Sequence, residues 1–261
     1  MDLQLENRIA LVTAASQGLG YATALQLARE GALVAICSRD EARVNAATDS
    51  IRVETGRSVL GITGDVSRAE DVEHIVERVV DEYGGLDILV TNAGGPPSAA
   101  FEEVTDEMWQ EAFNLNLMSA VRLIRKALPH LRSSTAPAVL TITSYSVKQP
   151  IPNLVLSNSI RMAVIGLTKT LALELGREGI RFNSILPGWT ETERVQDLME
   201  ARAQRNNTSV EEEIAKQAAD SPFGRMATPQ EFANVATFLC SPAASYVTGV
   251  MLPVDGGFYK G

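Results

Sequence analysis

The sequence has few cysteines, no long apolar run and an excess of negative charge. Its 261 residues include two cysteines, Cys37 and Cys240, which lie far apart in apolar surroundings. Such thiols are typical of buried side chains in a reducing compartment. No apolar stretch reaches the roughly 18–20 residues that a membrane span requires. The opening Met-Asp-Leu-Gln-Leu-Glu lacks the basic start and apolar centre of a secretion signal. We therefore expect a cytoplasmic protein with no membrane partner.

The charge and aromatic content exclude further classes of protein. The formal net charge is −9, which disfavours a broad surface for nucleic acid or anionic lipid. Aromatic residues make up 5% of the chain and hydrophobic residues 45%, so the core is expected to be aliphatic. We expect a small-molecule substrate, no nucleic-acid partner and no metal site.

Short β-branched runs alternate with longer helical patterns along the whole chain. This order predicts βαβ units and a parallel sheet, and apolar runs without alternation predict strands covered on both faces. The predicted fold is a single-domain, doubly wound α/β sheet of the Rossmann type over residues 1–261, with about seven strands and helices on both faces. The strands are predicted at 8–13, 33–37, 58–63, 87–91, 138–143, 180–186 and 250–254. The helices are predicted at about 18–30, 40–55, 68–83, 106–132, 157–176 and 229–240.

The segment 189–224 interrupts this alternation of strands and helices because it is long and charged. It is compatible with a solvated pair of surface helices. It is also compatible with a lid over a ligand cleft, because it directly follows the carboxyl end of a strand.

The first strand and first helix are joined by a glycine-containing turn. Gly18 and Gly20 remove side chains where a pyrophosphate must approach the backbone, and the helix N-terminus offers free N–H groups. A tight βα loop without a ligand is the alternative, but the position at the first βα junction favours a cofactor. The predicted cofactor residues of this turn are Thr13, Ala15, Ser16, Gly18, Leu19 and Gly20.

The end of the second strand predicts which dinucleotide is preferred. Ser38 and Arg39 stand where an acidic residue would accept hydrogen bonds from the ribose of NAD. A guanidinium can instead pair with a 2′-phosphate, so NADP(H) is expected over NAD(H). The alternative is a solvated arginine that precedes the next helix, with Asp40 as its N-cap.

Several further motifs follow the predicted strands. Asp65-Val66 follows the third strand, Asn92-Ala93-Gly94 the fourth, and Pro187-Gly188-Trp189-Thr190-Glu191-Thr192 the sixth. The sequence Leu-Thr-Ile-Thr-Ser ends the fifth strand at Ser144, and Ser157 and Arg161 follow it at spacings of thirteen and then four residues. Together these motifs resemble the classical short-chain dehydrogenase/reductase family, in particular its 3-oxoacyl-carrier-protein reductases. The resemblance covers nearly the whole chain. It implies cofactor contacts from Asp65, Val66, Asn92, Ala93, Gly94, Arg161, Pro187, Gly188, Thr190 and Thr192.

The resemblance also implies a reaction centre, with one departure from the family pattern. Asn116 matches the family's catalytic asparagine and Ser144 its serine, which donates a hydrogen bond to a substrate carbonyl. Ser157 and Arg161 stand where the family has tyrosine and lysine. A serine hydroxyl is a far weaker acid than a phenol, and arginine does not release a proton to a relay. Ala14 also replaces the first glycine of the cofactor turn, which is tolerable if its φ is negative.

Three accounts of the chemistry remain open. In one, another acid replaces the tyrosine; Lys148 is favoured over Tyr145, which is expected to point away from Ser144 if the strand continues. In another, Ser157 and Arg161 donate the proton through an ordered water. In the third, the protein is a catalytically silent NADP(H)-binding homologue that acts as a sensor or partner subunit. The first two make it an oxidoreductase that acts on a carbonyl or hydroxyl substrate, such as a 3-oxoacyl compound, by an atypical proton path.

The resemblance finally implies self-association. The predicted helices before and after the fifth strand have broad apolar coverage. Family members pair such helices between subunits, so a homodimer or homotetramer is expected.

Overall fold

Parallel strands form one seven-stranded sheet in the order β3-β2-β1-β4-β5-β6-β7. The computed structural model describes residues 1–260. The order reverses direction between β1 and β4, which leaves a crevice outside the carboxyl ends of these strands. The strands are β1 (Ile9–Val12), β2 (Leu33–Ser38), β3 (Val59–Thr63), β4 (Ile88–Thr91), β5 (Ala138–Ile142), β6 (Arg181–Pro187) and β7 (Met251–Val254).

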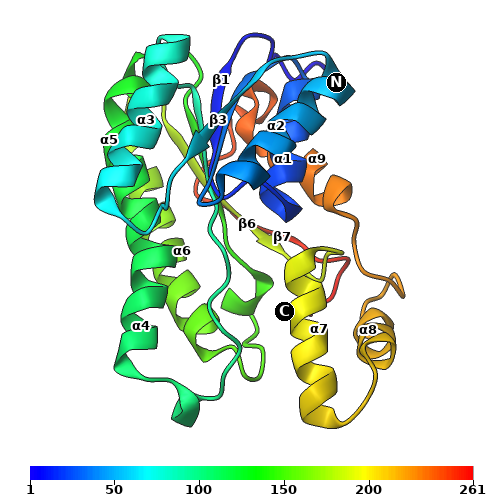
Figure 1. The fold of residues 1–261 in the computed structure, drawn as a ribbon. Helices are drawn as coiled ribbons and strands as arrows, with labels where there is room; N and C mark the ends of the chain where they lie inside the picture. The colour runs from blue at the N-terminus through cyan, green and yellow to red at the C-terminus, as the bar shows by residue number, and fades with distance from the viewer. Residues whose placement is uncertain (261) are drawn as a thin grey trace.

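Helices cover both faces of this sheet (Figure 1). One face carries α1 (Gly18–Arg29), α2 (Glu41–Thr55) and α9 (Pro229–Cys240). The other carries α3 (Ala69–Tyr83), α5 (Ser119–Ser133) and α6 (Val155–Leu175). The predicted doubly wound α/β fold is therefore confirmed.

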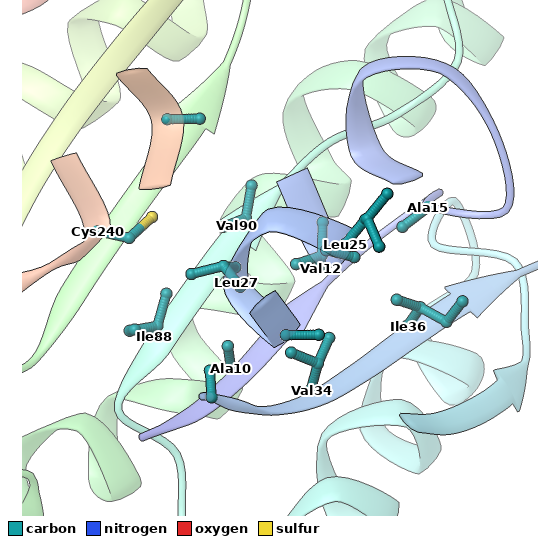
Figure 2. Packing of buried hydrophobic residues seen from close by; sticks show 14 of the residues in the cluster. Ala10, Val12, Ala15, Leu25, Leu27, Val34, Ile36, Ile88, Val90 and Cys240 are labelled. Carbon is teal, nitrogen blue, oxygen red and sulfur yellow. The ribbon is translucent and has the colours of Figure 1, made fainter. Parts of the chain in front are cut away.

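The strands read as continuous apolar runs because each side of the sheet has its own core. Ala10 and Val12 of β1 pack with the α1 side, as Figure 2 shows, whereas Leu11 between them packs with the α3 side. All three are fully buried. A strand with apolar contacts on both faces has no polar alternation, which is why these strands could be recognised within one or two residues of their ends.

The predicted helix 106–132 is interrupted. The structure instead has α4 (Asp106–Ala112), a π-helical segment at Phe113–Met118, and then α5. Such wide turns frequently accompany functional sites, because they re-aim side chains that a regular helix would place elsewhere. Asn116 lies within this segment.

The segment 189–224 contains a pair of helices, α7 (Glu193–Asn206) and α8 (Val210–Ala219). The turn between them is held by Glu213, whose Oε1 accepts hydrogen bonds from Thr208 Oγ1 at 2.7 Å and Asn206 Nδ2 at 3.1 Å. These bonds, together with one from Lys216, lower the pKa of Glu213 to about 2. The pair is thus joined by specific contacts rather than being only a solvated surface. Within residues 1–260, no helix is both long and apolar enough to cross a bilayer.

Candidate active site

A cleft of about 540 Å³ opens at the carboxyl ends of the strands. Its walls come from the loops after β1, β2, β3, β4, β5 and β6, together with the start of α6 and the start of α7. Most of the predicted cofactor residues line it: Ser16, Gly18, Leu19, Ser38, Arg39, Asp65, Val66, Asn92, Ala93, Gly94, Arg161, Pro187, Gly188, Thr190 and Thr192.

The glycine turn presents an open helix end to this cleft. Helix α1 begins at Gly18, whose φ of +61° lies in the left-handed region that glycine adopts without strain. Its N-cap, Gln17, makes no side-chain cap bond, and the first turn contains no acidic residue. The N–H groups and the positive end of the helix dipole can therefore bind an anion such as a pyrophosphate.

Three predicted cofactor residues, Thr13, Ala15 and Gly20, lie behind the cleft wall rather than on it. Thr13 Oγ1 donates to Asn92 O at 2.7 Å and accepts from Asn92 N at 2.9 Å. A Cβ at Gly20 would lie 2.7 Å from Asn92 Nδ2 and 2.8 Å from Ala14 O. Thr13 and Gly20 hold the turn against the loop after β4. The cofactor contacts of Thr13, Ala15 and Gly20 stay predictions.

Ala14 does not meet the condition under which an alanine fits this turn freely, a negative φ. Its φ is +46°, in the left-handed region where a Cβ is unfavourable by about 1–2 kcal/mol. The conformation is held in place because Ala14 O accepts a hydrogen bond from Asn92 Nδ2 at 3.0 Å. The alanine that replaces the family's glycine therefore strains the turn instead of fitting it freely.

The end of the cleft beside β2 and α2 holds more positive charge than the sequence indicated. Arg39 lines it as predicted, and Arg43 of α2 lines it as well. Arg43 Nη1 donates to Gln17 Oε1 at 2.6 Å, which links α2 to the glycine turn. Sequence analysis did not include Arg43, because it considered only Ser38 and Arg39 at the end of the second strand. The signal was present, since Arg43 lies in the first turn of the helix that begins two residues after Arg39.

Ser144, Ser157 and Arg161 come together at the opposite end, as predicted. Ser157 is 8% exposed, and its Oγ accepts a hydrogen bond from Arg161 Nε at 3.2 Å. Arg161 Nη1 also donates to the carbonyls of Ile142 at 3.2 Å and Thr143 at 3.3 Å, at the end of β5. Burial and, to a lesser extent, the neighbouring Arg194 lower the pKa of Arg161 to about 10. All three side chains line the cleft.

Two other predicted catalytic residues lie outside this group. Lys148 is exposed and is not part of the cleft lining, so the structure does not bring it to Ser144. Asn116 is buried behind the loop after β4, where its Nδ2 donates to Gly94 O at 2.9 Å. Its Oδ1 has no hydrogen-bond partner within the described residues. The amide therefore fixes Gly94 at the cleft wall and keeps one acceptor free.

Tyr145 differs from its expected orientation. The strand does not continue past Ser144; the chain turns into a 3-10 helix at Tyr145–Val147, capped by Ser144 Oγ, which accepts from Ser146 N at 3.1 Å. Tyr145 consequently lines the same cleft as Ser144. Its ring packs edge-on against Trp189 and Phe258. Burial raises its pKa to about 12, so the phenol is protonated at neutral pH.

The start of α7 closes one side of the cleft. Thr192 caps α7, and its Cγ2 would lie 3.7 Å from a Cβ at Gly18. Arg194 reaches across to the loop after β4, where its Nη2 donates to Pro96 O at 2.6 Å. Sequence reasoning missed Arg194, because only the packing of α7 over that loop brings the two together.

A doubly wound sheet with an open helix end at its switch point is the architecture of a dinucleotide-binding α/β protein. The chain belongs to the short-chain dehydrogenase/reductase family of oxidoreductases: the family profile described as enoyl-(acyl carrier protein) reductase matches residues 13–259.

Relatives and solved structures agree over nearly the whole chain. The chain is 35% identical to dehydrogenase/reductase SDR family member 4 from Oryctolagus cuniculus over 254 residues, which are 97% of this chain and 94% of that protein. It is similar to L-sorbose reductase from Gluconobacter frateurii, solved with NADPH and L-sorbose, at 34% identity and a TM-score of 0.95 over 100% of both chains. It is also similar to the NADPH-bound short chain oxidoreductase from Pseudomonas aeruginosa PAO1, described as containing an atypical catalytic center. That likeness has 33% identity and a TM-score of 0.88 over 98% of this chain and 99% of the other.

Proposed function

We propose that this protein is an NADPH-dependent reductase of carbonyl compounds, in which Ser157 takes the place of the family's tyrosine. The observation that carries the proposal is the hydrogen bond from Arg161 Nε to Ser157 Oγ inside the cleft. Because Ser157 accepts from the guanidinium, its own proton remains available for donation toward the cleft. The cationic neighbour also favours the negative charge that would develop on Ser157 Oγ.

The cleft residues fit the two ends of a dinucleotide. The open N-terminus of α1 suits a pyrophosphate, Asp65 lines the cleft after β3 at the end that also holds Arg39, and Asn92 and Gly94 line it after β4. When bound, the cofactor supplies the hydride that reaches the carbonyl carbon. At the carbonyl oxygen, Ser144 donates a hydrogen bond and Ser157 delivers the proton, which stays on the product hydroxyl. Water then supplies a new proton to Ser157.

The activity is tested by following NADPH absorbance with a panel of ketones, ketoses and 3-oxoacyl thioesters. L-sorbose belongs in this panel because a similar structure was solved with it. Oxidation of NADPH that depends on one class of carbonyl supports the proposal. Tight NADPH binding without turnover of any carbonyl would identify a catalytically silent homologue instead.

We further propose that Arg39 and Arg43 together select NADPH. Substituting either with alanine is expected to weaken NADPH binding roughly 10- to 100-fold, the effect of losing a charged hydrogen bond, and to change NADH binding little. Fluorescence titration with both cofactors measures this. Arg52→Ala is the matched control, because Arg52 lies on the same helix in an exposed ion pair with Asp49. Equal losses for both cofactors would contradict the assignment.

A homodimer or homotetramer is also proposed, formed through α4, α5 and α6. The support is exposed apolar surface on this side, where Met162 is 52% and Leu173 77% exposed. Sedimentation equilibrium is expected to give a multiple of the chain mass, and substitution of both residues by lysine is expected to lower it. A monomer at micromolar concentration would refute this.

A further inference from the structure

Two guanidinium groups face one end of the cleft without a carboxylate partner. Arg161 and Arg194 both line the cleft, and within residues 1–260 neither takes part in an ion pair. Each is half-buried. Removing a charged group from water is unfavourable unless an opposite charge or enough hydrogen bonds replace the water.

The hydrogen bonds within the protein leave donors on both groups unused. Arg161 uses Nε and Nη1, and no described residue accepts from its Nη2. Arg194 uses Nη2 for Pro96 O, and no described residue accepts from its Nε or Nη1. Its guanidinium lies against Gly95, where a Cβ would be only 2.7 Å from Nε. The glycine thus leaves room for the charged group at the cleft wall.

The surrounding charges do not neutralise this pair. Asp197 on α7 raises the pKa of Arg194, yet burial lowers it more, so the net shift is downward. Glu193 lines the cleft but is exposed. Asp255 and Asp220 also act on this end, where they raise the pKa of Tyr145, but neither forms an ion pair with Arg161 or Arg194 within residues 1–260. The two arginines therefore have no neutralising carboxylate in contact. An anion placed between the two arginines would offset both the burial of the guanidinium groups and their mutual repulsion.

The rest of this end is apolar. Tyr145, Ile151, Leu154, Trp189 and Leu198 line it, and Arg202 lies over the Trp189 ring with its Cζ 4.6 Å from the centroid. Such walls suit a hydrocarbon or aromatic body. The positive charge is next to Ser157, the residue proposed to serve the carbonyl oxygen, because Arg161 contacts Ser157 directly.

We propose that Arg194 binds a carboxylate of the substrate, with the positive charge of Arg161 beside it, and that the substrate is an apolar oxo acid with its carboxylate near the reducible carbonyl. This rests on the proposed reductase function and specifies its substrate class. A free acid, rather than a thioester or a sugar, matches two guanidinium groups beside the proton donor. The phosphates of the cofactor are anions too, so the experiment has to separate the two sources of negative charge.

The test compares 4-methyl-2-oxopentanoate with its uncharged methyl ester in NADPH oxidation assays. The wild type is expected to have a KM for the acid at least roughly 10-fold below that for the ester. In Arg194→Gln the KM for the acid rises roughly 10- to 100-fold and that for the ester stays nearly constant. Arg194→Lys, which keeps the charge, retains part of the preference. Arg205→Gln is the matched control, because Arg205 is exposed on the same helix and outside the cleft.

NADPH affinity is titrated in every variant, because it shows whether Arg194 binds the cofactor phosphates rather than a substrate carboxylate. Weaker NADPH binding in Arg194→Gln with an unchanged acid-to-ester ratio would assign Arg194 to the cofactor phosphates and overturn the proposal. Equal use of acid and ester by the wild type would overturn it as well, while leaving the reductase function intact. If neither is reduced, titration of oxamate and uncharged oxamide into the NADPH-loaded protein decides: Arg194-dependent binding of oxamate alone supports the anion site, and no difference refutes it.

Discussion

Replacing Ser157 with alanine is expected to lower kcat for carbonyl reduction by about 100-fold and to leave NADPH affinity nearly unchanged. General acid catalysis by a positioned side chain contributes at least this much, and Ser157 is the hydroxyl held next to a cation inside the cleft. Its side chain fills little volume, so alanine should not disturb packing. Stopped-flow measurement of NADPH oxidation at saturating substrate gives kcat, and fluorescence titration gives the dissociation constant.

The variants to compare with Ser157→Ala lie on the same helix and in the loop after β5. Ser159→Ala removes an exposed hydroxyl two residues further along α6 and should have no effect. Ser144→Ala should lower kcat roughly 100- to 1,000-fold, as loss of a donor to a developing oxyanion does. A Ser157→Ala protein with full activity would show that the proton comes from elsewhere. Tyr145→Phe would then be the next variant, because that phenol lines the cleft and is protonated.

The sheet and the glycine turn could be predicted because their signals are local. Strands buried on both faces leave continuous apolar runs, and a helix that begins at a phosphate site needs glycine where Gly18 has a positive φ. The position of Ser157 beside Arg161 followed from helical spacing alone, and the bond between them confirms that they share a face.

The errors arise where the backbone departs from regular geometry. Tyr145 was expected opposite Ser144 because residues alternate along a strand, but the chain leaves the strand at Ser144 and turns. The same turn places Lys148 at the surface. The π-helical segment around Asn116 adds a residue to a turn, and apolar periodicity does not register such an insertion. Arg194 depends on the packing of α7, which no local pattern encodes.

Substituting Gly20 with valine is expected to abolish measurable NADPH binding and to destabilise the fold by roughly 1–3 kcal/mol or more. Any Cβ at this position would lie 2.7 Å from Asn92 Nδ2, 2.8 Å from Ala14 O and 3.0 Å from Ala15 Cα. Two of these atoms belong to the backbone and cannot move aside. The hydrogen bond from Asn92 Nδ2 to Ala14 O, which holds the strained turn, would therefore be broken. Thermal denaturation and NADPH titration measure the two effects.

Two other glycines separate the stability effect from the binding effect. Gly176→Ala adds a methyl group into open space in a right-handed conformation far from the cleft, so neither stability nor affinity should fall. Gly94 lines the cleft, and a Cβ there meets nothing within 4 Å, so Gly94→Ala should fold normally. If the cofactor passes close to the loop after β4, that methyl group meets the ligand, and NADPH affinity falls with no change in melting temperature. Unchanged affinity in Gly94→Ala would mean that the nucleotide does not pass close to the loop after β4.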